Sequence, residues 1–291
     1  MASRTPHVRL LLLLLLALLV AAACGSSGPQ APVTRTPAPP APATRSPGTH
    51  VFIIVMENKS YREALSGTYT ASLARRYGVL TDYHAVSHPS LPNYLALTSG
   101  RTWGISDDRY HRLPPDGLGG QLTAARIPWR AYMEGMSTNC RDDGSGYAVK
   151  HDPFAYYGGS CPPAVVPFTS LAPDLRSDTP RFVWITPDLC HDTHDCAVAA
   201  GDRWLSTVVP EILGSPAWVD GGVLFITWDE GEGGDKTSNR VPTLVIGSHV
   251  VPAQPGVRGD HYALLATIED LLGVHRLGQA AQATPIALTA R

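Results

Sequence analysis

An apolar run that ends in two carboxylates constrains this chain more than any other feature. Residues 223–227 are Val-Leu-Phe-Ile-Thr, and Trp228, Asp229 and Glu230 follow them. The run predicts a buried strand that delivers both acids into a glycine-rich turn. Adjacent buried carboxylates repel each other unless a positive charge lies between them, and a metal cation supplies that charge. A solvated acidic loop is the alternative that the motif alone leaves open.

The same arrangement occurs near the start of the folded part. Residues 51–56 are Val-Phe-Ile-Ile-Val-Met, and Glu57 and Asn58 follow them. Functional groups collect at the carboxyl ends of strands in open α/β sheets, so the two strand ends can converge on one ion. Oxygen ligands suit a hard or borderline cation.

The rest of the chain alternates between strand and helix patterns. This alternation predicts an α/β fold with a mostly parallel central sheet and helices on both faces. The segment 135–180 is rich in Gly and Pro, and we interpret it as a long active-site insertion. Strands are expected at 50–56, 79–85, 128–133, 181–186, 223–228 and 241–247. Helices are expected at 68–77, 92–99, 118–126, 197–209 and 260–272.

Composition limits the partners. The 291 residues are 44% hydrophobic, which is enough for one large domain with its own core. The net charge of −2 gives no reason to expect nucleic acid as a partner. We expect a monomer.

The N-terminus predicts export. Basic residues precede an apolar stretch at 10–23, which is too short for a comfortable membrane span and fits a signal peptide over 1–24. Small residues before Cys24 resemble a bacterial lipoprotein processing site, so we expect lipidation of Cys24 and membrane contact through that anchor alone. Ala21 stands where Leu is commoner, which keeps simple secretion open. Residues 25–48 form a Pro-, Ala- and Thr-rich disordered linker, and 49–291 form the folded domain.

Cysteine usage agrees with export. Setting Cys24 aside leaves an even set, which predicts two disulfides. Proximity favours Cys140 with Cys161 and Cys190 with Cys196, although other pairings are possible. A cysteine metal site is the weaker alternative, because no C-x-x-C pair is present.

Ser90 is the candidate nucleophile. It lies in a Pro-rich turn, with Pro92 suited to the first turn of the helix that follows. A hydroxyl at a helix N-terminus lies at an anion site, and beside a metal it can lose its proton and attack phosphorus. On this motif alone, a helix cap is the simpler interpretation.

Three further segments offer polar groups. Residues 190–196 hold His191, Asp192 and His194 within a predicted disulfide loop after a strand, and a polar surface loop is the minority alternative. Lys150 and His151 offer cations for an anionic substrate. His261 begins the last helix, where a lone His is more often structural.

The motifs together resemble the bacterial phosphoesterase family of secreted acid phosphatases and phospholipase C-type enzymes. They are VFIIVMENKSY, HPSLPNYLALTSG, KHDPF, HDTHDC, TWDEGEGG with VPTLVIG, and DHYALLATIEDLLG, and they occur in order over 49–275. The resemblance implies the alkaline phosphatase-like fold. The short acid phosphatases are the more similar members, because the chain lacks the C-terminal domains of longer phospholipases C.

The resemblance also implies roles for single residues. The expected metal ligands are Glu57, Asn58, Asp229 and Glu230. The expected catalytic residues are Ser90 as nucleophile, Asn93 near the phosphoryl oxygens, Asp192, His194, and His261 in the phosphate pocket. Lys150 and His151 are expected to bind substrate. His191 departs from the family's Asn-Asp-x-His-Asp pattern and has no role assigned.

We therefore expect an exported, metal-dependent acid phosphatase that cleaves phosphomonoesters through a phosphoserine, with His194 or His261 protonating the leaving alcohol. The divalent metal is Ca, Mg or Zn, and the all-oxygen ligand set favours one hard cation. A phospholipase C-type phosphodiesterase acting on phospholipid head groups is the alternative enzyme, and a non-catalytic lipoprotein that binds a phosphorylated ligand is the alternative of another class. An α/β-hydrolase is disfavoured because no G-x-S-x-G motif is present.

Overall fold

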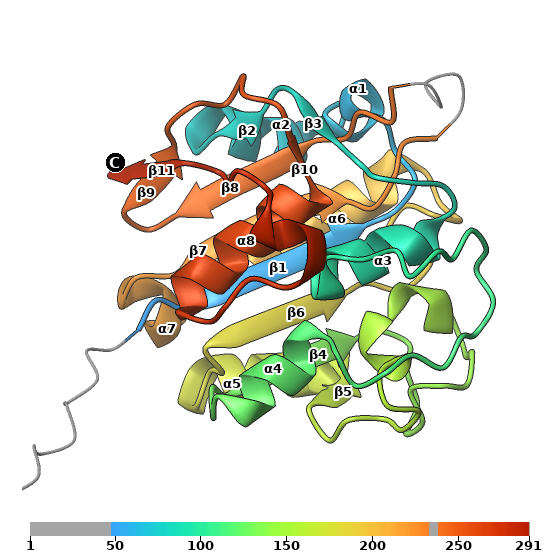
Figure 1. Ribbon diagram of the computed structural model, residues 1–291. Helices are drawn as coiled ribbons and strands as arrows, with labels where there is room; N and C mark the ends of the chain where they lie inside the picture. Colours follow the sequence, from blue (N-terminus) through green and yellow to red (C-terminus); the bar gives the residue numbers. More distant parts are fainter. Residues whose placement is uncertain (1–47, 233–237, 291) are drawn as a thin grey trace, which may run out of the picture. The chain divides into compact units, whose positions relative to one another are not determined.

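The computed structural model describes residues 48–232 and 238–290 (Figure 1). The predicted signal peptide, Cys24 and the linker up to residue 47 lie outside the described residues. Among those that are described, no helix combines the length and the apolarity needed to cross a bilayer.

A seven-stranded sheet forms the centre of the folded unit, in the order β2-β8-β7-β1-β6-β4-β5. Strands β7, β1, β6, β4 and β5 run parallel, whereas β8 is antiparallel to both β7 and β2. The central strands β1, β6 and β7 are buried along their whole length, as expected for a sheet covered on both faces. The strands are β1 (Val51–Met56), β2 (Val79–Leu80), β4 (Trp129–Met133), β5 (Val165–Pro167), β6 (Phe182–Thr186), β7 (Val223–Trp228) and β8 (Thr243–Gly247).

Helices cover both faces of this sheet, which confirms the predicted fold class. Helix α3 contacts α4 and α8, while α2, α5 and α7 contact α6. Figure 1 shows α3 and α8 in front of the sheet and α6 behind it. The helices are α1 (Tyr61–Ala64), α2 (Thr68–Arg76), α3 (Ser90–Ser99), α4 (Leu118–Ala124), α5 (Leu171–Ser177), α6 (Val198–Leu213), α7 (Pro216–Val219) and α8 (His261–Leu272).

The predicted strand at 79–85 is wrong as one element. After β2, the Thr81 N–H donates to Pro255 O and the chain leaves the edge of the sheet. It then forms β3 (Tyr83–His84), which pairs in parallel with β10 (Gly259–Asp260) in a separate two-stranded sheet. A second two-stranded sheet joins β9 (Val250–Pro252) to β11 (Leu288–Ala290), which run antiparallel.

The insertion at 135–180 contains more regular structure than its composition predicts. It supplies β5 as the edge strand beside β4, together with α5 and short 3-10 turns at Val149–His151, Pro153–Ala155 and Phe168–Ser170. A further 3-10 turn lies at Gly278–Ala281. The Cys140–Cys161 disulfide ties the insertion together, and Cys190–Cys196 closes the loop after β6.

Candidate active site

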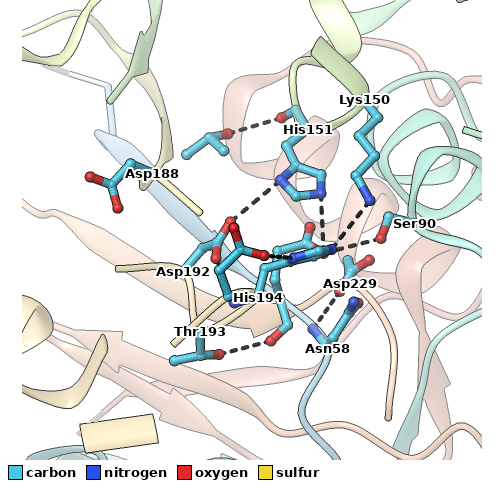
Figure 2. Close-up of polar contacts among 12 residues, drawn as sticks. Asn58, Ser90, Lys150, His151, Asp188, Asp192, Thr193, His194 and Asp229 are labelled. Carbon is cyan, nitrogen blue, oxygen red and sulfur yellow. Dashed lines mark hydrogen bonds and ion pairs between the residues drawn. The ribbon is translucent and has the colours of Figure 1, made fainter. Parts of the chain in front are cut away.

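The carboxyl ends of β1 and β7 bring two predicted site residues side by side. The strands are in register with Met56 opposite Trp228, so Glu57 and Asp229 follow at the same edge. Asp229 N–H donates to Met56 O at 2.9 Å, and Asn58 N–H donates to Asp229 Oδ1 at 3.1 Å (Figure 2). Glu57 and Asp229 are fully buried. The convergence expected from the strand ends therefore occurs.

Helix α3 places a hydroxyl against these carboxylates. Ser90 is its first residue, and its side chain donates to Glu57 Oε2 at 3.1 Å and to Glu230 Oε1 at 3.4 Å. One helical turn later, the Tyr94 hydroxyl donates to Glu57 Oε1. The positive end of the α3 dipole lies at Ser90, where it favours an anion. Ser90 thus has the surroundings of an activated nucleophile rather than only those of a cap.

The Asn93 side chain is bonded to the backbone of the turn before Ser90, and its expected role near the phosphoryl oxygens stays a prediction. Its amide oxygen accepts from Val86 N and Ser87 N at 3.0 Å, and its amide nitrogen donates to Ser87 O and Pro89 O at 3.0 and 3.1 Å. The side chain is fully buried and holds the turn before Ser90. Asn93 is therefore a positioning residue, because its polar atoms are occupied by backbone groups.

The disulfide loop after β6 supplies the opposite wall. Asp192 Oδ1 accepts from His194 N at 2.7 Å, while Asp192 Oδ2 lies 3.4 Å from His151 Nδ1. Thr193 has a left-handed backbone with φ 81°, and its hydroxyl donates to Glu57 O at 2.8 Å. Cys190–Cys196 closes the loop and so holds these groups in place.

The two expected cations differ in kind. His151 is 2% exposed between Glu57 and Asp192, and burial, with the charges of Lys150 and His194, holds its pKa well below the usual range. Burial therefore disfavours the cationic form that the sequence predicts for His151. Burial lowers the pKa of Lys150, but Asp108 and Glu57 outweigh it and the net pKa is raised. Lys150 is therefore the charged member of the pair.

The rim of the site is formed by residues that reach solvent. The side chains of His88, Lys150 and His194 are 34%, 23% and 26% exposed, whereas Ser90 is 1% exposed. Lys150 Nζ lies 3.3 Å from His194 Nε2 and points toward Ser90 in Figure 2. These three side chains are therefore the solvent-exposed part of the site around the buried Ser90 hydroxyl.

His88 and Tyr94 were missed in the sequence. His88 Nδ1 contacts Glu230 Oε2 directly, and Tyr94 holds the other oxygen of Glu57. A signal existed for both, since His88 lies two residues before Ser90 and Tyr94 lies on the same helical face one turn after it.

His261 is buried behind the site. Its Nε2 lies 2.6 Å from Asp229 O and its Nδ1 lies 2.9 Å from the Tyr83 hydroxyl. Burial lowers the pKa of His261 to about 4, against a smaller opposing effect of the Asp229 carbonyl. Both ring nitrogens contact protein atoms, and the roles expected for His261 in the phosphate pocket and as a proton donor stay predictions. In the structure, His261 positions Asp229.

Burial makes the carboxylates costly without a cation. The pKa of Glu57 is raised well above its usual range, and those of Asp192 and Asp229 are raised to about 8. Burial is the largest cause in each case, and repulsion between the carboxylates adds to it. Within the described part of the chain, Asp192 Oδ2, Asp229 Oδ2 and His151 Nε2 have no hydrogen-bond partner. Such orphaned atoms fit the ligands of a divalent metal.

The potential ligands form two overlapping sets. The Asn58 amide can take two orientations. With its nitrogen turned toward the carboxylates, it donates to Glu57 Oε2 and Glu230 Oε1 at 3.1 and 3.3 Å. With its oxygen turned toward them, the oxygens of Asn58, Glu57 and Glu230 form a cluster that a cation stabilises. Glu57, His151 and His194 also offer ligand atoms within 4.8 Å of one another. The predicted all-oxygen set is therefore joined by two histidine nitrogens.

His191 belongs to a separate cluster. Its Nδ1 lies 3.0 Å from Glu134 Oε2 and 3.3 Å from Asp188 Oδ1. The same carboxylate oxygens accept backbone N–H groups of Asp188, Cys190 and His191. These contacts satisfy the cluster internally, so His191 stabilises the loop after β6.

Comparison with known proteins agrees with this geometry. The model of the phosphoesterase family matches residues 63–275. A phosphatidylinositol-3-phosphatase of Mycobacterium tuberculosis is 31% identical over 250 residues, which are 81% of each chain. An acid phosphatase of Aspergillus fumigatus is 26% identical over 78% of this chain, and the match spans 56% of the fungal protein.

Solved structures show the same fold. A protein of the alkaline phosphatase superfamily from Vibrio parahaemolyticus matches with a TM-score of 0.53 at 15% identity, over 78% of this chain and 67% of that one. The periplasmic domain of a phosphoethanolamine transferase from Campylobacter jejuni also matches with a TM-score of 0.53, over 79% of this chain and 91% of that one, at 10% identity. With its buried hydroxyl set between carboxylates at the end of a parallel sheet, the chain belongs to the phosphoesterase family and is a phosphoric ester hydrolase.

Proposed function

We propose that this protein is an exported, metal-dependent acid phosphatase that cleaves phosphomonoesters through a phosphoserine intermediate. The observation that carries the proposal is the Ser90 hydroxyl, which lies at the positive end of α3 in contact with Glu57 and Glu230. The names of the matched relatives, acid phosphatases and a phosphatidylinositol-3-phosphatase, support a monoester substrate.

Ser90 performs the first substitution. Its Oγ forms a bond to phosphorus while the bond from phosphorus to the leaving oxygen breaks, and the Ser90 proton passes to Glu57 Oε2, which accepts the Ser90 hydrogen bond at 3.1 Å. The Lys150 ammonium binds the non-bridging oxygens, where negative charge is concentrated. Thr193 holds the backbone carbonyl of Glu57 and Tyr94 holds its Oε1, which positions Oε2 to accept from the Ser90 hydroxyl.

His194 transfers the protons. Its Nδ1 is held by Asp195 Oδ1 at 2.7 Å, so its Nε2 faces the site beside Lys150. Protonated His194 gives the proton on its Nε2 to the leaving alkoxide. The neutral ring then accepts a proton from the water that attacks the phosphoserine. As the water oxygen bonds to phosphorus, the bond from phosphorus to Ser90 Oγ breaks, Glu57 returns the proton to Oγ, and inorganic phosphate is released.

Glu57, Asn58, Asp229 and Glu230 would hold the cation, with His151 as a further donor. When bound, a divalent cation supplies Lewis-acid stabilisation of phosphoryl oxygens and lowers the pKa of an adjacent hydroxyl. The mixture of nitrogen and oxygen donors supports a borderline ion such as zinc over calcium or magnesium.

We also propose that the protein is exported through the signal peptide at 1–24 and anchored by a lipid on Cys24. Two disulfides in the folded unit support an oxidising compartment. Mass spectrometry of the protein in the membrane fraction tests for the lipid on Cys24. A Cys24→Ala variant, which has no site for the lipid, should be released into the medium.

The test of the reaction compares three substrates: 4-nitrophenyl phosphate, bis(4-nitrophenyl) phosphate and phosphatidylcholine. We expect turnover of the monoester, loss of at least a thousandfold in Ser90→Ala, and loss on chelation that a divalent ion reverses. Trapping of a phosphorylated Ser90 at low pH would identify the intermediate. Faster turnover of the diester or the lipid would assign the phospholipase C-type reaction instead.

A further inference from the structure

An open pocket of about 540 Å³ lies beside the proposed active site. We call it the tyrosine–arginine pocket, and six of its lining residues carry the argument: Asp108, Tyr110, Arg141, Tyr147, Lys150 and Tyr156. Its volume is within the range of small-molecule sites. Most of these residues come from the insertion at 135–180, whose role in catalysis the fold alone does not explain.

Two of its residues connect the pocket to Ser90. Lys150 lines the pocket and its Nζ lies 3.3 Å from His194 Nε2. Asp108 also lines it, and Asp108 Oδ1 accepts from the N–H of Leu91, the residue after Ser90, at 3.0 Å. A phosphoryl group held between Lys150 and Ser90 therefore has its leaving group at the entrance of this pocket.

Aromatic side chains form one wall of the pocket. The Tyr110 ring stacks on Tyr156, with ring centroids 5.2 Å apart and an angle of 30° between the rings. Tyr110 is nevertheless 44% exposed, one of the few large hydrophobic residues with such exposure in the described chain. The Tyr147 hydroxyl is engaged with Cys140 O at 2.6 Å and with Asp152, which fixes the wall. Tyr110 thus offers a rigid, accessible face on which a planar ring can stack.

The Arg141 guanidinium also lines the pocket, and among the described residues it has no carboxylate partner. Arg109 is held by Asp107 and Lys150 by Asp108, but no carboxylate of the described residues lies within ion-pair distance of Arg141. Arg141 NH1 donates instead to the carbonyl of Gly159 at 3.0 Å. The neighbouring Cys140–Cys161 disulfide fixes the backbone beside Arg141. An anion bound there gains charge-assisted hydrogen bonds without breaking an existing ion pair.

From this arrangement we propose that the tyrosine–arginine pocket binds the leaving group of the substrate and selects one that carries a planar ring and a second phosphate, the chemistry of a nucleoside bisphosphate. The ring stacks on Tyr110 and the second phosphate is bound by Arg141, while the phosphate to be cleaved lies at Lys150 and Ser90. This inference rests on the proposed phosphatase function.

The experiment measures phosphate release as kcat/KM for four probes: adenosine 3′,5′-bisphosphate, adenosine 5′-monophosphate, ribose 5-phosphate and 4-nitrophenyl phosphate. In the wild-type protein we expect the bisphosphate to exceed the monophosphate by about tenfold, the usual effect of a charge-assisted contact. We expect adenosine 5′-monophosphate to exceed ribose 5-phosphate by about fivefold through stacking. Absence of turnover of 4-nitrophenyl phosphate would remove the proposed function itself, whereas turnover of this probe without the preferences would overturn only the pocket.

Two variants and one matched control assign the preferences. Arg141→Gln should abolish the preference for the bisphosphate over the monophosphate, and Tyr110→Ala should abolish the preference for the nucleotide over ribose 5-phosphate. Arg112→Gln is the control, because Arg112 donates to Gly158 O, next to the carbonyl bound by Arg141, but does not line the pocket. The control should keep both ratios, and its melting temperature should match that of Arg141→Gln. Equal ratios in wild type and Arg141→Gln, or equal loss in the Arg112 control, would overturn the assignment.

Discussion

Tyr94→Phe isolates the support that α3 gives to Glu57. The substitution removes one hydroxyl, which donates to Glu57 Oε1, and leaves the ring in the core. Tyr94 is fully buried, and burial together with the Glu57 carboxylate raises its pKa well above the usual range, so it remains a donor at all working pH values. The variant therefore leaves one oxygen of a buried carboxylate without its donor.

The magnitude follows from the charge of the acceptor. A hydrogen bond to an ionised group contributes about 1.5–3 kcal/mol, so kcat/KM for 4-nitrophenyl phosphate should fall by roughly 10- to 150-fold. The Tyr94 hydrogen bond also lowers the pKa of Glu57, against the larger opposing effects of burial and of Asp229 and Asp192. Its removal raises that pKa further, so the acid limb of the pH–rate profile should move to higher pH.

Tyr157→Phe is the matched control for this measurement. The Tyr157 hydroxyl lies 2.8 Å from Thr98 Oγ1. Thr98 is in α3, the helix that carries Tyr94, but Tyr157 does not contact Glu57. Loss of the Tyr157 hydroxyl should change stability without moving the acid limb. The reasoning is refuted if Tyr94→Phe and Tyr157→Phe have kcat/KM values within a factor of about two of each other and identical acid limbs.

Three further predictions concern stability and its relation to activity. Asn93→Ala removes four hydrogen bonds to the backbone of the 86–89 turn, although Ser87 O keeps Asn239 Nδ2 as a donor. It should therefore lower the melting temperature well below that of Ser90→Ala, and equal melting temperatures would contradict the role of Asn93. Burial raises the pKa of Glu269 from 4.5 to about 8, only partly offset by the Leu277 N–H, so its stabilising contribution is complete below pH 4.5 and is lost as pH rises through about 8. Unfolding in urea at pH 5 and pH 8 should therefore show a smaller loss of stability in Glu269→Gln than in wild type, and parallel losses would contradict this. The chain-entropy model assigns about 3 kcal/mol to Cys140–Cys161 and about 2 kcal/mol to Cys190–Cys196, from sequence separations of 21 and 6. Replacing Cys140 and Cys161 by Ser should thus lower the free energy of unfolding more than replacing Cys190 and Cys196. Replacing Cys190 and Cys196 should lower kcat more, because their loop carries Asp192 and His194. The reverse order in both measurements would refute these roles of the two disulfides.

Much of the site could be predicted because its residues directly follow strands. Glu57 and Asn58 come after one apolar run, and Asp229 and Glu230 come after another. Parallel strands in register must deliver such residues to one edge of the sheet, whatever the details of packing. The two cysteine pairs favoured by proximity in the sequence are the two disulfides of the structure. They could be predicted because each closes a short loop.

The roles of buried polar residues could not be predicted in this way. The sequence shows that Asn93 and His261 lie in the right motifs, but their hydrogen bonds go to Val86, Ser87 and Pro89 in one case and to Tyr83 and Asp229 in the other. In the sequence, both residues have the chemistry to contact a phosphate. In the fold, both have their polar atoms occupied by protein groups. Which partner a buried donor or acceptor takes depends on the packing of distant segments, and every alternative partner is equally possible in the sequence.

The sequence by itself therefore determined the fold class, the edge of the sheet that carries the chemistry, and the identity of the carboxylates and of Ser90 beside them. Periodicity and strand ends are local properties, which a chain carries without reference to its remaining parts. Only the tertiary structure decided that the pKa of His151 is lowered while that of Lys150 is raised, that 79–85 divides between two sheets, and that Arg141 shares a pocket with Tyr110. Each of these depends on burial and on charges brought together from distant segments, because desolvation and Coulomb interactions act through space rather than along the chain.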